Sequence, residues 1–125
     1  MPPYEDKLFA PPAPLADVAL RDPLSGVTVR SVSMLLDSGV DITVVPRNAV
    51  HLLGAAVNPG QGYEVTGFDG KPTALAAIQL DLLFLSRAFK GRFLIVDQPW
   101  GILGRDILNH LTMVLDGPRL TWSEQ

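Results

Sequence analysis

One short segment of this sequence holds residues that could do acid–base chemistry. Asp37 directly follows an apolar run and is followed by Ser38 and Gly39. A carboxylate among apolar residues is costly to bury unless hydrogen-bond donors reach it. The Ser38 hydroxyl and the Gly39 N–H are two such donors, and glycine lets another segment approach closely. The segment therefore predicts a rigid platform for a carboxylate that exchanges protons.

Other interpretations of the same residues are weaker but stay open. Asp-Ser-Gly is first of all a turn tripeptide, so by itself it marks a turn more often than a site. A phosphatase pattern Asp-x-Asp-x-Thr would need a second aspartate where Gly39 stands. Ser38 lacks the Gly-x-Ser-x-Gly elbow of a nucleophilic serine. Segment 67–73 lacks the glycine and hydroxyl positions of a phosphate-binding loop.

The elements that must position this segment are mainly short strands separated by turn residues. The sequence predicts strands over 15–20, 27–36, 42–45, 63–66, 73–85, 92–96, 102–104, 112–115 and 119–122, a loop over 58–62, and helices over 46–53 and 105–110. Asp69-Gly70 between two strand-like runs indicates a tight hairpin, because both central residues need positive φ. Many short strands with two short helices predict an all-β class, as a compact barrel or sandwich.

The N-terminal residues differ in composition from the rest of the chain. Residues 1–14 hold five of the eleven prolines. Proline cannot donate to a sheet or sit inside a helix, so this stretch predicts an extended arm or a disordered tail. The domain itself is expected to span 15–125, a length that suits one domain.

Composition excludes several classes of site and partner. The chain has no cysteine and two histidines, so we expect no thiolate chemistry, no metal site and no cofactor. The net charge is −3 and no run of basic residues occurs, which argues against nucleic acid as a partner. The longest apolar stretch, 80–85, is interrupted by Asp81 and is too short to span a membrane. With no signal-peptide pattern at the N-terminus, we expect a cytoplasmic protein that does not bind membranes.

The Asp37 segment resembles the active-site motif of the retropepsin-like aspartic peptidases, the retroviral type. That motif has apolar residues, then Asp-Thr/Ser-Gly-Ala, a polar residue, and a Thr or Ser two positions later. The matching residues here are Asp37, Ser38, Gly39, Val40, Asp41 and Thr43. Val40 stands where alanine is usual in the family.

Two further features of the family occur in the same order along this chain. A late signature of two apolar residues and a glycine, followed by a short helix, is matched by Ile102, Leu103, Gly104, Arg105 and Asp106. Retroviral members have Gly-Arg-Asn there, and Asp106 replaces the asparagine. Between the two signatures the family has a glycine-rich hairpin, the flap, and residues 63–74 hold that place. The resemblance covers residues 15 to 122 and implies a retropepsin-like closed barrel with a flap hairpin and one or two short helices.

The resemblance also implies an activity and a set of roles. A chain with one such motif would form a homodimer in which two Asp37 carboxylates activate a water to hydrolyse a peptide bond. Ser38 would brace the two active-site loops, and Gly39 would present its carbonyl to the substrate. The flap residues Gly67, Phe68, Asp69 and Gly70 would close over a polypeptide bound in extended form. Arg105 would pair with Asp41.

Two alternatives to an active endopeptidase remain. Val40 and the Pro-rich arm also suit a catalytically weak or inactive retropepsin-like module that binds peptides or dimerises. An unrelated small barrel, with Asp-Ser-Gly as a simple turn, is the more distant alternative. Loss of cleavage on Asp37→Asn distinguishes an enzyme from both.

Overall fold

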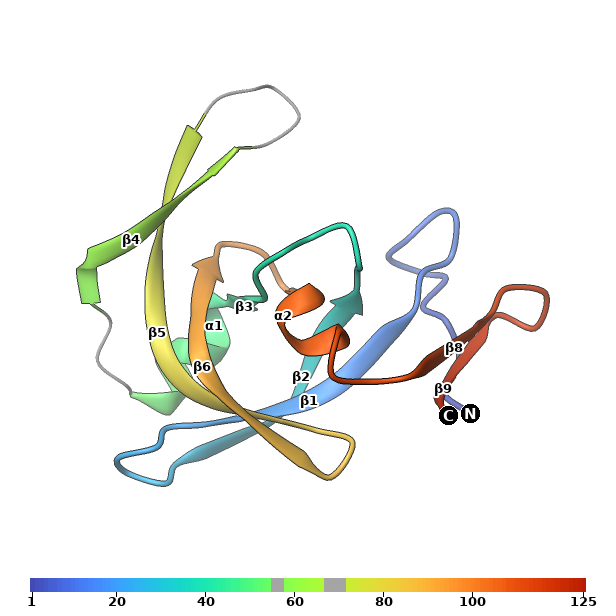
Figure 1. Ribbon diagram of the computed structural model, residues 1–125, viewed down its shortest axis with the longest axis horizontal. Coiled ribbons are helices and arrows are strands. Elements are labelled where there is room, and N and C mark those ends of the chain that lie inside the picture. Colours follow the sequence, from blue (N-terminus) through green and yellow to red (C-terminus); the bar gives the residue numbers. More distant parts are fainter. Residues whose placement is uncertain (55–57, 67–71) are drawn as a thin grey trace.

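The computed structural model describes residues 1–54, 58–66 and 72–125, with side chains described outside 55–74. The elements follow one another as β1 (Leu15–Arg21), β2 (Thr28–Leu36), β3 (Val44–Pro46), α1 (Arg47–Leu53), β4 (Asn58–Thr66), β5 (Pro72–Phe84), β6 (Arg87–Val96), β7 (Gly101–Leu103), α2 (Arg105–Leu108), β8 (Met113–Asp116) and β9 (Thr121–Glu124) (Figure 1). Most of them are the predicted strands and helices, shifted by a few residues.

Six of the described strands close into a barrel. They run in the order β1-β2-β7-β3-β6-β5, and β5 pairs back onto β1. The pairs β2–β7 and β3–β6 are parallel, whereas β1–β2, β5–β6 and β3–β7 are antiparallel. Strand β4 lies outside the ring and pairs with β5, and the two project from the barrel as a long hairpin (Figure 1). The structure therefore confirms the predicted mostly β closed barrel with two short helices.

The barrel encloses one main apolar core. Its fully buried side chains include Leu20, Met34, Leu80, Leu82, Ile95 and Leu103. Burial of one such side chain stabilises the fold by roughly 1.5–3 kcal/mol. Trp122 of β9 is also buried, contacts Phe84, and donates its indole N–H to Leu15 O at 3.2 Å. Trp122 therefore attaches the C-terminal hairpin β8–β9 to the barrel.

Two predicted boundaries are wrong for identifiable physical reasons. Residues 58–62, predicted as a loop, form the first half of β4. The pairing register shifts between Asn58 and Tyr63, and such irregular edge strands tolerate proline and glycine. Strand β6 begins at Arg87 rather than at residue 92. Among its first five residues, Arg87, Ala88 and Lys90 are exposed and Phe89 alone is large and apolar, so the hydrophobic pattern misses them, although each pairs with β5.

The N-terminal arm, residues 1–14, folds back onto the chain instead of extending away from it. Glu5 and Ala13 exchange two backbone hydrogen bonds of 2.8 and 3.0 Å. Tyr4 N donates to Leu120 O at 2.7 Å, and Trp122 N donates to Pro2 O at 3.0 Å. These bonds pair the start of the arm with β9 and correct the expectation of an extended or disordered segment.

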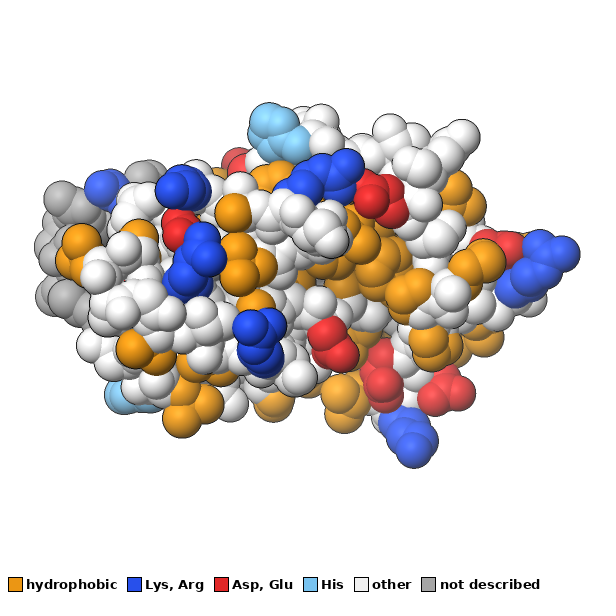
Figure 2. Space-filling model, turned by 90° about the horizontal axis from the view of Figure 1, so that it is seen from below, with side chains coloured by type: hydrophobic (Ala, Val, Ile, Leu, Met, Phe, Trp, Pro, Cys, Tyr) orange, Lys and Arg blue, Asp and Glu red, His pale blue; other side chains and the backbone are white. Residues whose placement is uncertain are grey.

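The surface carries mixed charge. On the face seen in Figure 2, Lys and Arg side chains are dispersed among acidic and apolar ones. Among the described helices, none is both long and apolar enough to cross a membrane.

Candidate active site

Asp37 directly follows the last residue of β2, Leu36, and begins a loop. Its backbone N–H donates to Leu103 O at 3.1 Å, which continues the parallel β2–β7 pairing by one step. The Asp37 side chain is half-buried, and its Oδ1 accepts the N–H of Gly39 at 2.8 Å. The predicted Gly39 donor is therefore present, whereas the neighbouring Ser38 is exposed to solvent.

The loop that begins with Asp37, residues 37–43, is fixed by hydrogen bonds to the first turn of α2. Both carboxylate oxygens of Asp106 accept the Thr43 N–H, at 3.0 and 3.2 Å, and one also accepts the Thr43 hydroxyl at 2.6 Å. The same hydroxyl accepts Gly104 N–H at 2.9 Å. Thr43 is fully buried, and these bonds satisfy its polar atoms. The two motifs recognised in the sequence thus meet in one hydrogen-bonded cluster.

Arg105 holds the other side of the same loop. Its backbone N–H donates to Val40 O at 2.8 Å, and its guanidinium Nη1 donates to Ser38 O at 2.8 Å. Among the ion pairs of the described residues, none joins Arg105 to Asp41, so that expected pair is wrong for this chain. The backbone bond to Val40 places Arg105 beside the Ser38 carbonyl, while Asp41 is exposed.

Two glycines, Gly101 and Gly104, allow β7 and the residue after it to pack closely against the backbone of residues 40–44. A Cβ added to Gly104 would lie 2.7 Å from Val40 O and 3.1 Å from the carbonyl carbon of Ile42. A Cβ on Gly101 would lie 2.4 Å from Val44 O. Real Cβ atoms do not approach backbone this closely, so each position requires glycine. The sequence identified Gly104, but nothing in it marked Gly101.

A second apolar cluster borders the active-site loop. Its buried members are Val44, Ala77 and Leu94, with Ile42, Leu75, Val96 and Ile102 packed against them. Ile42 belongs to the loop and Ile102 to β7, so the cluster borders the loop that carries Asp37. Leu103 points instead into the main core, where it is fully buried. The cluster gives the site an apolar flank that could hold side chains of a ligand.

The predicted flap residues Gly67, Phe68, Asp69 and Gly70 lie outside the described residues. The strands on either side of them are described. They pair in antiparallel register from Tyr63 opposite Leu75 to Thr66 opposite Pro72. The hairpin β4–β5 thus occupies the place expected for the flap (Figure 1).

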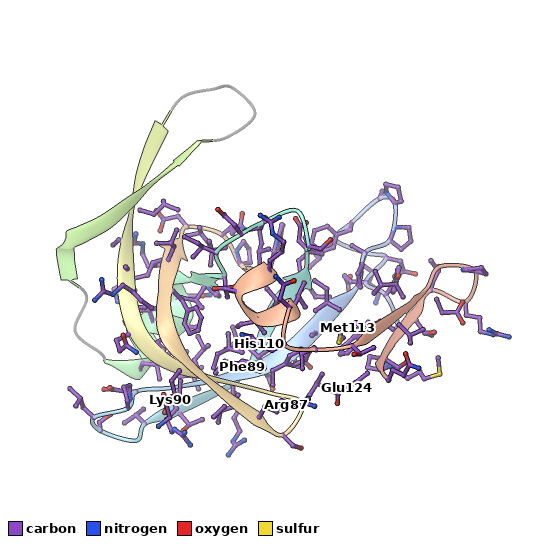
Figure 3. The ribbon with its side chains drawn as sticks, viewed as in Figure 1. Arg87, Phe89, Lys90, His110, Met113 and Glu124 are labelled. Carbon is purple, nitrogen blue, oxygen red and sulfur yellow. The ribbon has the colours of Figure 1, made fainter. Side chains whose placement is uncertain are left out.

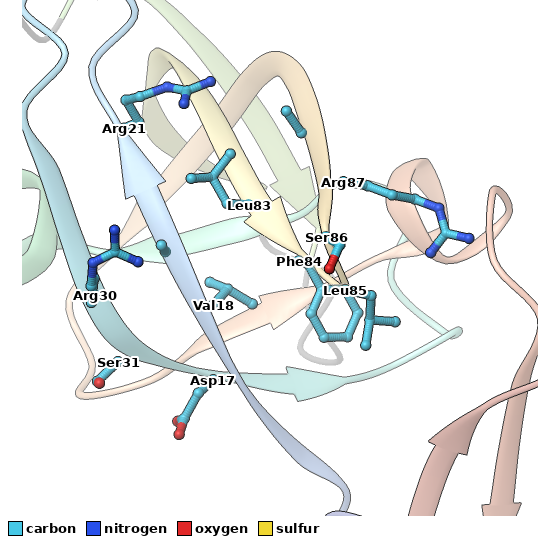
Figure 4. A pocket seen from close by; sticks show the side chains of 12 residues that line it. Asp17, Val18, Arg21, Arg30, Ser31, Leu83, Phe84, Leu85, Ser86 and Arg87 are labelled. Carbon is cyan, nitrogen blue, oxygen red and sulfur yellow. The ribbon is translucent and has the colours of Figure 1, made fainter.

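Two hollows of the surface lie away from Asp37. One, of about 770 Å³, lies between β6 and α2, where Phe89 and His110 contact each other with ring centroids 6.3 Å apart (Figure 3). The other, of about 550 Å³, lies on the side of β1 and β5 and includes Arg21 and Arg30 (Figure 4). Neither contains a group of three potential metal ligands among the described residues.

Among known proteins, this chain matches solved structures only. No family model matches the sequence, and no curated protein matches it. Among solved structures, EIAV protease complexed with the inhibitor HBY-793 is similar over 78% of this chain and 86% of that chain. The TM-score is 0.60 and the sequence identity is 26%. The likeness thus covers most of both chains.

Proposed function

Since this chain has the retropepsin-like fold of a retroviral protease, we propose that it is one half of a homodimeric aspartic endopeptidase. The main support is Asp37, a half-exposed carboxylate on a loop that both motifs fix in place. Residues 15–125 would form the peptidase domain, and 1–14 a separate arm. The described chain supplies one Asp-Ser-Gly motif, so a second copy would bring the second catalytic aspartate across a twofold axis.

The proposed mechanism follows from two carboxylates placed close together. Two such groups do not ionise together easily, so the pair of Asp37 side chains shares one proton. The charged member takes a proton from a bound water, while the neutral member donates one to the peptide carbonyl. The water oxygen adds to the carbonyl carbon and gives a tetrahedral gem-diol. Collapse of that intermediate breaks the C–N bond as the nitrogen gains a proton, with no covalent enzyme intermediate.

The neighbouring residues would position Asp37 and the peptide. Ser38 and Gly39 would face the second copy and the substrate backbone. Thr43, Asp106 and Arg105 would keep the loop rigid through the bonds already described. The substrate would bind in extended form beneath the β4–β5 hairpin, with residues 67–70 over it and the apolar cluster flanking its side chains.

The test is cleavage of a mixed peptide library by wild type and by Asp37→Asn. Wild type should cleave between about pH 4 and 7 with a bell-shaped profile, because activity needs one protonated and one charged carboxylate. Asp37→Asn should lose at least about 10³-fold in rate, since it removes the group that activates water. Asp97→Asn is the matched control, because Asp97 is an exposed aspartate outside both motifs, and it should stay active.

Two measurements separate the possible outcomes. Inhibition of wild type by HBY-793, the inhibitor bound to EIAV protease, would support an aspartic mechanism. Sedimentation should show a dimer, with or without that inhibitor. Equal cleavage by wild type and Asp37→Asn would reject the proposal. A folded, dimeric wild type that cleaves nothing but binds peptides would favour the alternative, an inactive peptide-binding module.

A further inference from the structure

The first part of β6 has a neighbouring strand on one side of its backbone only. On that side it pairs with β5 without interruption from Arg87 to Leu94. On the other side, β3 pairs with β6 over residues 94–96 alone. Within the described part of the chain, no strand pairs with residues 87–93 on this second side. We call this stretch, residues 87–93, the free edge, and at about 3.3 Å per residue it is roughly 20 Å long.

The backbone of the free edge turns hydrogen-bonding groups away from the sheet. Leu94 donates its N–H to Thr43 O at 3.2 Å, so its backbone groups point toward β3 and away from β5. In an antiparallel ladder, alternate residues direct both backbone groups to the same side. Because the register with β5 has no shift, Arg92, Lys90 and Ala88 turn theirs to that side as well. Among the described residues, no backbone group is bonded to these three on that side.

The free edge forms one wall of a hollow. The hollow has a volume of about 770 Å³, and α2 with His110 forms the opposite wall (Figure 3). Phe89 is half-buried against the main core, and its ring centroid lies 6.3 Å from that of His110. The buried Ile107 of α2 also lines the hollow. A strand edge beside an apolar floor is the arrangement that binds an extended peptide by strand addition.

The charge at this hollow is opposite in sign to that of the whole chain. Arg87, Lys90 and Arg92 line it and are exposed, whereas the chain has a net charge of −3. Asp106 is the acidic residue of the lining, and its carboxylate already accepts hydrogen bonds from the active-site loop. Arg87 pairs with Glu124 at one end of the free edge (Figure 3). Within the described residues, Lys90 and Arg92 have no ion-pair partner, so the hollow favours an acidic ligand.

A peptide fits the free edge better than other acidic molecules do. Each residue that faces away from β5 offers both an N–H donor and a C=O acceptor, and an extended peptide supplies both in return. The phosphates of a nucleic acid only accept hydrogen bonds, so they would leave the carbonyl groups without donors. The free edge of a second copy would bring like charges opposite one another.

We propose that the free edge binds an acidic segment of a partner protein as an added antiparallel strand. Residues directly opposite one another in such a pair point to the same face of the sheet. The residues opposite Lys90 and Arg92 would therefore be acidic, and those between them, on the face of Phe89, would be apolar. The ligand is a segment of about seven residues in which Glu or Asp alternates with apolar side chains. Binding there does not depend on the proposed peptidase activity at Asp37.

The probe is a fluorescent, end-capped peptide in which valine alternates with three glutamates. Fluorescence anisotropy measures its Kd for the full chain at low salt. When the glutamates lie opposite Ala88, Lys90 and Arg92, their N–H groups point toward β6. N-methylation of the glutamates should therefore abolish binding. N-methylation of the valines, the matched control, should change Kd by less than about threefold, because their N–H groups point away.

Two substitutions of one residue separate charge from backbone pairing. Lys90→Ala removes a cation and should weaken binding by about threefold. Lys90→Pro also removes the N–H that faces the ligand and should weaken binding by about tenfold or more. An edge strand accepts proline where the N–H points outward, so this variant should keep its pairing with β5. Arg119→Ala removes an exposed cation elsewhere, between β8 and β9, and should bind like wild type.

Five results would overturn the proposal. The first is no binding of the unmodified probe by folded wild type, and the second is equal binding of both methylated probes. The third is an equal loss in Lys90→Ala and Lys90→Pro, which would mean that charge alone acts. The fourth is binding of a ten-nucleotide oligothymidylate in place of the peptide, and the fifth is a smaller sedimenting mass in Lys90→Pro, which would assign the free edge to a second copy.

Two further comparisons keep the test decisive. If Lys90→Pro does not fold, the two methylated probes on wild type still distinguish strand addition from attraction between charges. Asp37→Asn should bind the probe as wild type does. The site on β6 can thus stand or fall separately from the proposed peptidase.

Discussion

Two aspartates of this chain lie in opposite surroundings. Asp81, in the second half of β5, is 4% exposed, and its Oδ2 accepts the N–H groups of Arg21 Nε and Nη2 at 3.1 and 3.0 Å. Asp37 is half-buried on a loop, and within the described part of the chain its side chain accepts one hydrogen bond, from Gly39. A buried carboxylate must be paired to be stable. A carboxylate that activates water must instead keep an open side, so the contrast distinguishes a structural aspartate from a candidate catalytic one.

The hairpin around Asp81 and the loop that carries Asp37 are also stabilised by different kinds of contact. The β5–β6 hairpin around Asp81 has an unbroken register from Ala77 opposite Leu94 to Phe84 opposite Arg87. The loop 37–43 is held by α2, whose residues are more than sixty positions away in the sequence. We therefore expect changes near Asp81 to affect stability, and changes around the loop to affect activity as well.

The largest expected effect on stability comes from unpairing Asp81. Arg21→Met leaves a buried carboxylate without its partner and should lower the free energy of unfolding by about 3 kcal/mol. The side chain of Arg21 is 36% exposed, so we expect the low end of the range for buried pairs. Urea denaturation measures the change. Arg30→Met, on the rim of the same hollow (Figure 4), should shift the midpoint little.

A double variant sharpens that test. Arg21→Met/Asp81→Leu removes both charges and should recover most of the lost stability, because no unpaired carboxylate remains. Lys90 lies opposite Asp81 in the strand register and is a possible substitute partner. A loss below about 0.5 kcal/mol in Arg21→Met would mean that Lys90 takes over or that water reaches Asp81.

Sequence alone predicted the barrel and the two motifs, because both depend on local residue types and their order. It placed Asp37 at a strand end and Arg105 at the start of a helix, as the structure has them. It could not predict that Arg105 contacts a backbone carbonyl rather than Asp41. That choice depends on where the loop backbone lies, which is fixed by tertiary contacts.

The N-terminal arm shows the same limit of prediction from sequence alone. Its prolines predicted an extended or disordered segment, and composition cannot say where an irregular segment docks. The contact between Phe9 and Trp100 joins residues about ninety positions apart. The only sequence signal was two isolated aromatic residues, which are equally consistent with simple packing.

The next prediction concerns the bonds that hold the active-site loop. Asp106→Ala removes the acceptor of the Thr43 N–H and hydroxyl and should cost about 2 kcal/mol, because those donors are left buried. Peptide cleavage should fall as well, since the loop carries Asp37. Asp106→Asn is the matched control, because its amide oxygen still accepts a bond, and it should lose less than about 1 kcal/mol.

Thermal unfolding and the cleavage rate, measured on the same samples, check this prediction. If Asp106→Ala unfolds earlier but cleaves at the wild-type rate at a temperature where it is folded, the bonds stabilise the fold without positioning Asp37. The contrast drawn above between the two regions would then fail, because the loop would behave like the hairpin.

The smallest predicted effect lies at the turn of the β5–β6 hairpin. Its two central residues, Leu85 and Ser86, have φ of 53° and 60°, the left-handed region that favours glycine. Ser86 is exposed, whereas Leu85 packs against the core, so Ser86 is the site to change. Ser86→Gly removes a Cβ that costs about 1 kcal/mol there, partly offset by the greater freedom of glycine in the unfolded chain. The net gain should be about 0.5 kcal/mol and raise Tm by about 2 °C.

Ser86→Ala is the control for that change, because it keeps the Cβ and should give no rise in Tm. Scanning calorimetry of both variants measures the difference. The cleavage rate of Ser86→Gly should equal that of wild type, since no hydrogen bond within the described part of the chain joins this turn to the loop that carries Asp37. A Tm below that of Ser86→Ala would mean that the turn is not strained at Ser86. A changed cleavage rate would mean that the hairpin and the active-site loop are coupled.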